Sequence, residues 1–128
     1  MKKTISFVLG AILFGCILCT TALAVEARWV NVTMISPSIS ASDQEYTSYV
    51  VGVSGTTKMT CTMVLYSKNI FGSYTEVSRT SSTYFGREHE FVGSYSIESG
   101  TTYKLVTTVS VTANGTTETA TNTFEKRC

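Results

Sequence analysis

The sequence predicts an all-β domain, a seven-stranded antiparallel β-sandwich that follows a cleaved signal peptide. Seven short segments after residue 28 alternate apolar and polar side chains with a period of two, the pattern of half-buried strands. All seven tyrosines lie after residue 24, in a part of the chain rich in threonine and valine, which favour pleated structure. The chain has one proline, and no stretch shows helical spacing of apolar residues. A single closed barrel is the alternative.

The first 24 residues have the layout of a secretory signal peptide. Lys2 and Lys3 precede an apolar run of 14 residues from Ile5 to Leu18, and Ala22-Leu23-Ala24 supplies a cleavage site of small residues. We expect cleavage after Ala24 and a secreted domain at residues 25–128, without a stable membrane span.

Two other interpretations of this leader stay open. Gly15-Cys16 places a cysteine after a small residue, as in a lipoprotein, although Phe14 and the apolar residues that follow fit that pattern poorly. An uncleaved anchor is the second, but a membrane span needs about 20 apolar residues.

The charge of the exported part excludes several partners. It carries eight Lys and Arg (the ten of the whole chain less Lys2 and Lys3) against nine Asp and Glu, so its net charge is −1. A nucleic-acid-binding protein needs a basic stripe to neutralise phosphates, and none is present. The same argument weakens binding to anionic lipid. Its length of 104 residues fits one domain.

The first four strands follow from the alternation. One covers residues 29–35, breaks at Pro37 and resumes around Ile39. Strand 45–53 places alternate residues, including Tyr49 and Val51, on one face. Strand 58–67 has an unbroken apolar face, and strand 74–80 follows it. That apolar face consists of Met59, Cys61, Met63 and Leu65.

The last three strands are 88–94, 102–112 and 116–124. Strand 102–112 turns Tyr103, Leu105, Val109 and Val111 inward. Asn114-Gly115 suits a two-residue type I′ turn, because both positions need positive φ. In the resulting register Leu105 meets Phe124 on the core face. On the other face hydroxyl residues oppose one another, and Lys104 meets Glu125 as an ion pair.

The turn before residue 103 resembles a feature of known sandwiches. Residues 97–105, Ile-Glu-Ser-Gly-Thr-Thr-Tyr-Lys-Leu, resemble the turn that enters the sixth strand of fibronectin type III and other immunoglobulin-like domains. The resemblance implies a tyrosine corner at Tyr103, with a buried ring and a hydroxyl bonded to the backbone just upstream. It also implies that the sandwich is immunoglobulin-like.

A broader resemblance covers most of the exported chain. It is similar to a group of small secreted proteins of Gram-positive bacteria with no known function. The shared features are residues 54–58, 63–65, 72–77 and 100–103. The family tends to carry tryptophan at the position of Tyr74 and glutamine at that of Tyr66, and it implies no activity.

The residue types do not predict an enzyme, a metal site or a cofactor. His89 is the only histidine and Asp43 the only aspartate, and we expect them at opposite ends of the sandwich, too far apart for a catalytic triad. The remaining carboxylates are scattered rather than clustered as metal ligands.

The two cysteines outside the leader are expected to be free thiols. In an immunoglobulin-like sheet, strands 58–67 and 102–112 are antiparallel neighbours. The hairpin register then sets Cys128 opposite Thr101, at the start of strand 102–112, whereas Cys61 lies near the other end of strand 58–67. About seven residues of strand separate the two positions along the sheet, which corresponds to roughly 23 Å at ~3.3 Å per residue. A disulfide needs Cα atoms within ~7 Å. We expect a buried Cys61 and an exposed Cys128 able to pair with another chain.

A loop of exposed aromatic residues is the candidate binding site. Tyr84, Phe85 and Arg87 lie in the connection before strand 88–94, at the same end as the turns near residues 54–57 and 113–115. They either form a patch for a sugar ring or protein surface, or fold back over the end of the core. Ile70-Phe71 lies at the opposite end and cannot join that patch.

The threonines at alternate positions 117–123 form a row on the last strand. Ice-binding surfaces use such rows in several ranks, but one strand supplies one rank, so a soluble edge strand is the favoured interpretation. The sequence therefore predicts a secreted, non-catalytic binding or structural module at the cell envelope or outside the cell. An envelope protein or a glycan fits as partner, and the alternative function is a stand-alone carbohydrate-binding module.

Overall fold

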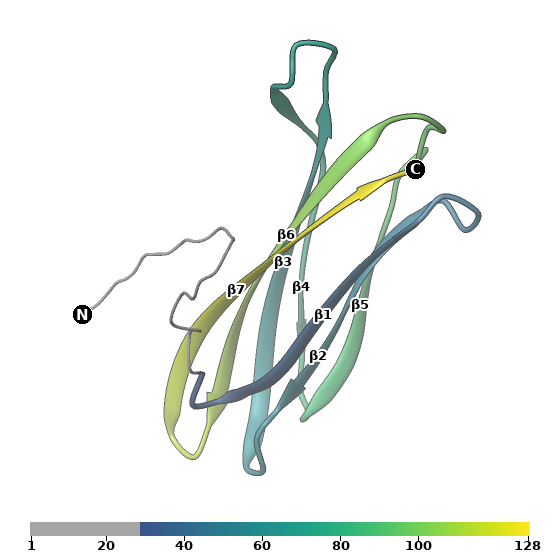
Figure 1. Ribbon diagram of the computed structural model, residues 1–128. Coiled ribbons are helices and arrows are strands. Elements are labelled where there is room, and N and C mark those ends of the chain that lie inside the picture. The colour runs from purple at the N-terminus through teal and green to yellow at the C-terminus, as the bar shows by residue number, and fades with distance from the viewer. Residues whose placement is uncertain (1–28) are drawn as a thin grey trace.

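The computed structural model describes residues 29–128, which form seven strands in two antiparallel sheets (Figure 1). One sheet has the order β1-β2-β5, and the other has the order β4-β3-β6-β7. The strands are β1 (Val32–Ser40), β2 (Glu45–Gly52), β3 (Thr56–Lys68), β4 (Tyr74–Tyr84), β5 (Glu88–Ser94), β6 (Thr102–Ala113) and β7 (Thr116–Arg127). The all-β prediction is confirmed, as two separate sheets rather than a closed barrel. The predicted signal peptide lies outside the described residues.

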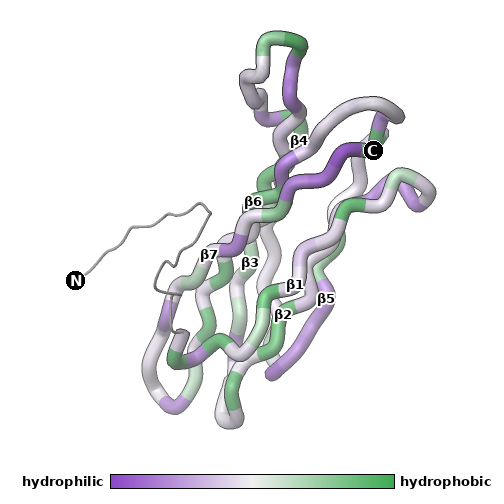
Figure 2. The backbone as a smooth tube through the Cα atoms, viewed as in Figure 1, coloured by the Kyte–Doolittle hydropathy of each residue, from purple (hydrophilic) through white to green (hydrophobic). Residues whose placement is uncertain are grey.

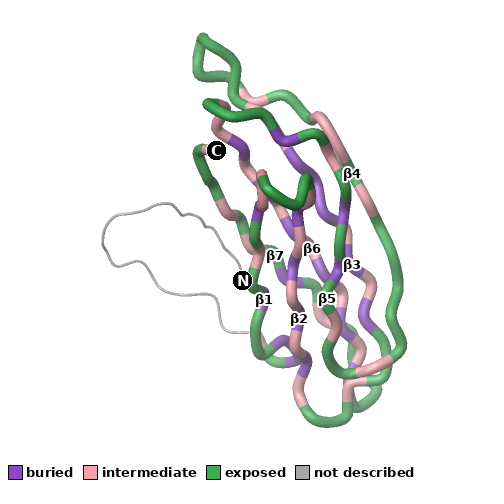
Figure 3. The backbone as a smooth tube through the Cα atoms, turned by 90° about the vertical axis from the view of Figure 1, so that its right-hand side faces the viewer, coloured by how far each residue is buried: buried purple, intermediate pink, exposed green. Residues whose placement is uncertain are grey.

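Strand β6 carries the most regular burial pattern of the fold. Every second residue from Tyr103 to Ala113 is buried, and Leu105, Val109 and Val111 have no exposed surface (Figure 3). Its neighbour β3 buries the predicted face, from Met59 to Leu65. The three-stranded sheet covers this surface with residues such as Ile39, Val50 and Phe91. The core is therefore the apolar layer between the two sheets, as a sandwich requires.

Two hydroxyl contacts cross this layer. The Ser48 hydroxyl on β2 and the Thr107 hydroxyl on β6 lie 2.5 Å apart, and both side chains are buried. The hydroxyl of Tyr46 lies 2.7 Å from that of Ser78 on β4. Because each buried hydroxyl meets another, neither contact leaves a polar group unsatisfied in the core.

The inward face of β2 differs from what the alternation alone suggests. Tyr49 and Val51 do share a face, but it is the outer one; the buried positions are the even-numbered ones from Tyr46 to Gly52. A serine is tolerated inside because Thr107 supplies its hydrogen-bond partner across the core.

Strand β1 runs through Pro37 without the predicted break. It is an edge strand, and its carbonyls at Ile35 and Ile39 accept hydrogen bonds from Asn122 Nδ2 and Lys126 Nζ of β7. Backbone groups two residues apart point the same way. The nitrogen of Pro37 therefore faces the free edge too, where a missing N–H costs no ladder bond.

The β6–β7 hairpin has the predicted register but lacks the predicted ion pair. Leu105 pairs with the half-buried Phe124, and Asn114 and Gly115 both have positive φ. Lys104 lies opposite Glu125, yet its ammonium group lies over the Tyr74 ring, 4.3 Å from the centroid. Within residues 29–128 the ion pair that does form joins Arg79 to Glu76 at 3.0 Å.

The turn into β6 has the geometry expected of a tyrosine corner. The ring of Tyr103 is buried, and its hydroxyl accepts a hydrogen bond of 2.8 Å from the backbone N–H of Glu98. The ring also contacts Tyr95 edge to face, with centroids 6.3 Å apart. This contact fixes the β5–β6 connection against the start of β6.

The Ser48–Thr107 contact gives the first prediction. Replacing Ser48 by Ala leaves the Thr107 hydroxyl unsatisfied in the core, so we expect a loss of about 1–3 kcal/mol in the free energy of unfolding. The double variant Ser48→Ala/Thr107→Val removes both hydroxyls and is expected to recover most of that loss. Urea denaturation of the single and double variants measures both values. If the double variant instead loses the sum of the two single-variant losses in the free energy of unfolding, the Ser48–Thr107 contact is contradicted.

Candidate functional site

Three connections and the first described residues meet at one end of the sandwich, the loop end. It comprises the turn at residues 53–55, the β4–β5 connection at 85–87, the β6–β7 turn at 114–115, and residues 29–31. Gly52 N–H donates to Arg87 O at 2.7 Å, and Val53 N–H donates to Asn31 O at 2.9 Å. The Asn114 side-chain amide donates to Ser54 O at 3.2 Å. The loops are thus tied to one another and form a connected surface.

Tyr84 belongs to β4 rather than to a loop. The sequence placed the end of this strand at residue 80, but residues 81–84 continue the ladder, and Tyr84 pairs with Met59. Hydroxyl pairs such as Thr60 with Thr83, 3.1 Å apart, support the extension. The Tyr84 ring stacks on His89 of β5 with centroids 4.0 Å apart, and His89 meets the buried Phe91 edge to face. Tyr84 therefore packs across the side of the sandwich where β4 and β5 face each other.

Phe85 and Arg87 remain accessible at the loop end. Phe85 is 76% exposed, so its ring does not cover the core. The Nε of Arg87 donates to Gly52 O at 3.1 Å, which anchors the exposed side chain while the other guanidinium N–H groups stay available as donors. Of the three predicted site residues, Phe85 and Arg87 can meet a partner freely, and Tyr84 is partly engaged in packing. Their role in binding stays a prediction.

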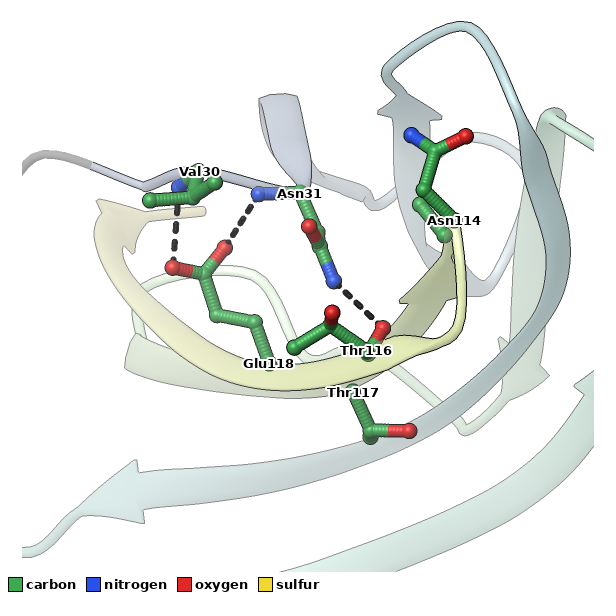
Figure 4. A pocket seen from close by; sticks show the side chains of 7 residues that line it. Val30, Asn31, Asn114, Thr116, Thr117 and Glu118 are labelled. Atoms are coloured by element: carbon green, nitrogen blue, oxygen red, sulfur yellow. Dashed lines mark hydrogen bonds between the residues drawn. The ribbon is translucent and has the colours of Figure 1, made fainter.

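An open hollow lies beside the β6–β7 turn (Figure 4). The Glu118 carboxylate accepts hydrogen bonds from the backbone N–H groups of Val30 and Asn31, at 2.8 and 2.7 Å. The buried Asn31 amide donates to Val111 O at 2.9 Å and to Thr116 O at 2.8 Å. The carboxylate thereby clamps the start of the described chain against β7. The hollow is lined by Val30, Asn31, Ala113, Asn114, Thr116, Thr117 and Glu118.

This clamp was not expected from the sequence. Its partners are 87 and 88 residues apart in the chain, and they join a side chain to backbone groups, which leaves no periodicity or motif. The only sequence signal is an acid among the threonines of β7.

The outer face of the four-stranded sheet is hydroxyl-rich across all four strands. The hydroxyl pairs on this face include Thr62 with Ser81 at 3.0 Å, Thr108 with Thr121 at 3.2 Å, and Ser110 with Thr119 at 2.8 Å. Because β4, β3, β6 and β7 lie side by side, the threonine row expected on one strand is part of a wider surface.

A cluster of tyrosines and lysines borders this hydroxyl face toward the β3–β4 loop. Lys104 Nζ lies 4.3 and 5.1 Å from the ring centroids of Tyr74 and Tyr66, and Lys68 Nζ lies 5.8 Å from that of Tyr74. Burial raises the pKa of the Tyr74 hydroxyl, and the nearby Glu125 carboxylate adds to this effect. Cation–π contacts thus hold the lysine heads against the aromatic rings.

Within residues 29–128, no group of three or more His, Cys, Asp or Glu side chains could hold a metal ion. Asp43 lies in the β1–β2 turn, where its carboxylate accepts from the Ser40 hydroxyl at 3.1 Å, and His89 is stacked on Tyr84. The same part of the chain contains no helix long and apolar enough to cross a membrane.

Both cysteines in the described part of the chain carry free thiols. Cys61 is buried in β3, as expected. The prediction of an exposed Cys128 is wrong: it is half-buried and packs against the core. Its backbone explains this position, since Cys128 N–H donates to Thr101 O at 2.9 Å and Cys128 O accepts from Gly100 N–H at 3.1 Å.

Comparison with known proteins adds no family assignment, because no protein-family model and no curated protein sequence matches the chain.

The clamp predicts a local effect of Glu118. In Glu118→Ala the amides of Val30 and Asn31 lose their acceptor, so we expect their hydrogen exchange to quicken at least about tenfold, the equivalent of ~1.4 kcal/mol. Exchange measured by NMR at single amides checks this. Glu90→Ala serves as the control. Unchanged exchange at Val30 and Asn31 contradicts the clamp.

Burial raises the pKa of the Cys61 thiol from 9.0 to about 12. The folded protein therefore keeps the Cys61 proton at pH values where the unfolded chain has lost it, so this group's stabilising contribution falls as pH rises from about 9 to about 12. We expect a thiol reagent at pH 8 to modify Cys61 only in denaturant. Rapid modification of Cys61 in the native protein, followed by mass spectrometry of peptides, contradicts this assignment.

Proposed function

We propose that the protein is an exported, non-catalytic binding module with an immunoglobulin-like fold, which contacts its partner through the loop end. The observation that carries the proposal is Phe85, a large aromatic side chain left 76% exposed on a surface of interlinked loops. Binding sites in β-sandwiches are often built from loops held by a rigid scaffold. The leader at residues 1–24 supports export.

The strand pairings support the immunoglobulin-like part of the proposal. In such domains the first, second and fifth strands share one sheet, and the third, sixth and seventh share the other. The pairs β1–β2, β2–β5, β3–β6 and β6–β7 follow this scheme. The fourth strand joins β3 here instead of β5, which is a departure from the constant-type arrangement. The Tyr103 hydroxyl contact adds a local feature of the same folds.

The chemistry of the loop end suits a partner with both apolar and hydrogen-bonding groups. Phe85 offers a ring face for stacking, and Arg87 offers guanidinium N–H groups for carbonyl, carboxylate or hydroxyl oxygens. Backbone hydrogen bonds between neighbouring loops preorganise the surface, which lowers the entropy cost of binding.

A stand-alone carbohydrate-binding module is the second candidate. The observation that favours it is the same Phe85 ring, because aromatic faces stack on the apolar faces of sugar rings. The hydroxyl-rich outer sheet face gives weaker support, since its hydroxyls largely hydrogen-bond to one another.

Binding assays with matched aromatic variants test the proposal. The domain from residue 25 onward is applied to a glycan array and used in pull-downs from envelope extract. We expect Phe85→Ala to abolish retention of a specific partner, whereas Phe71→Ala, which removes a comparably exposed ring at the opposite end, retains it. A glycan partner identifies the carbohydrate-binding alternative. Retention that survives Phe85→Ala removes the loop end from consideration.

A further inference from the structure

The β3–β4 hairpin stands out from the opposite end of the sandwich (Figure 1). Its loop covers residues 69–73, and its two large apolar side chains, Ile70 and Phe71, are 93% and 86% exposed. Figure 2 shows an apolar apex on this loop with polar segments behind it. The exposed apolar side chains are therefore concentrated at the outermost point of the hairpin.

The loop is held in one conformation by its own hydrogen bonds. The side-chain oxygen of Asn69 accepts from the N–H groups of Phe71 and Ser73, at 2.9 and 3.0 Å. The backbone of Asn69 bonds to Gly72 and Ser73 at 3.0 and 2.8 Å, and Gly72 adopts φ +86°, a conformation that favours glycine. Asn69 thus organises a turn that keeps Ile70 and Phe71 out of the core.

Two lysines and two tyrosines lie behind the apex. Lys68 pairs with Tyr74 at the base of the loop, and Tyr66 pairs with Lys104 further along β3. Lys68 and Tyr74 lie at most roughly 10 Å behind Phe71, at ~3.3 Å per residue. The cation–π contacts keep these ammonium groups beside the rings.

We propose that the apex of the β3–β4 hairpin inserts Ile70 and Phe71 into the interfacial region of a lipid bilayer. This surface is distinct from the loop end, so the inference goes beyond the proposed function. Tyrosine and lysine side chains favour the headgroup level, and interfacial apolar groups insert about 5–10 Å. Behind the apolar apex lie Lys68 and Tyr74, and then Tyr66 with its β6 neighbour Lys104. This sequence of groups matches the order of layers in a bilayer surface.

The hydrogen bonding of the hairpin favours a bilayer over a pocket on another protein as its partner. Protein interfaces surround an apolar anchor with a rim of groups that form directed hydrogen bonds. At the apex the Asn69 side-chain oxygen accepts hydrogen bonds within the loop, and behind it the lysine ammonium groups lie against tyrosine rings, so these groups are not directed at a partner.

Charge plays a secondary part in this contact. The net charge of −1 for residues 25–128 provides no overall attraction to anionic lipid. Near the hairpin the charges of Lys68 and Lys104 outweigh that of Glu125, because Glu76 is already paired with Arg79. We therefore expect modestly tighter binding to anionic than to zwitterionic vesicles. Two apolar side chains alone give weak, reversible attachment.

Co-sedimentation with vesicles tests the proposal. The chain from Val25 onward is used, because it contains every described strand and lacks the apolar run at residues 5–18, whose hydrophobicity would obscure the contribution of the hairpin. Vesicles contain equal parts of phosphatidylglycerol and phosphatidylcholine. We expect Phe71→Ser to weaken partitioning about tenfold or more, while Phe85→Ser at the opposite end leaves it unchanged. Both positions are exposed, so neither change threatens folding.

A fluorescence measurement then locates the inserted residue. Trp29→Phe removes the only tryptophan, and a new tryptophan is placed by Phe71→Trp or, as the control, by Phe85→Trp. We expect vesicles to shift the emission of the first variant to shorter wavelength and leave the second unchanged. Equal sedimentation of wild type and Phe71→Ser, no sedimentation of the wild type, or a shift confined to the control overturns the proposal.

Discussion

The fold depends on the burial of two apolar sheet faces against each other. Each sheet has one face that cannot remain in water, and strand β6 shows this most clearly, because its alternate residues are buried along its whole length. Burying a Leu or Val side chain contributes about 1.5–3 kcal/mol, so this layer dominates the stability of a chain with few ion pairs among its described residues. The Ser48–Thr107 and Tyr46–Ser78 contacts then specify how the two sheets align.

The same constraint determines where interaction surfaces can lie. With the apolar residues of the strands turned inward, the large apolar groups with the greatest exposure lie outside the strands, at Val30, Ile70, Phe71 and Phe85. The proposed loop-end site and the proposed membrane-contacting hairpin therefore occupy opposite ends of the two-sheet domain (Figure 1). A module built this way can hold a partner at one end while its other end rests on a bilayer.

Local sequence patterns predicted the fold well where neighbouring residues determine the backbone geometry, as in the β6–β7 hairpin. Asn114-Gly115 and the period-two pattern of residues 102–124 predicted the β6–β7 register, because a two-residue turn leaves one alignment. The strand break predicted at Pro37 was wrong, because a proline is tolerated in an edge strand. Which strand forms the edge is decided only when the sheet assembles. The sequence also did not show which face of β2 is buried. Ser48 can be buried because it hydrogen-bonds to Thr107, which lies 59 residues away in the chain.

Candidate sites were predicted less completely, for a related reason. The sequence identified Phe85 and Arg87 and the end of the sandwich at which their loop lies. It did not predict the Glu118 clamp. It also predicted an ion pair of Lys104 with Glu125, whereas the Lys104 ammonium group contacts the rings of Tyr66 and Tyr74. These depend on long-range contacts between side chains and backbone or aromatic groups. A nuclear Overhauser spectrum of the folded domain tests the central claim most directly. The two-layer packing predicts side-chain cross-peaks between Ser48 and Thr107 and between Tyr46 and Ser78; their absence, with backbone cross-peaks that join β2 to β3 in one continuous sheet, would contradict it.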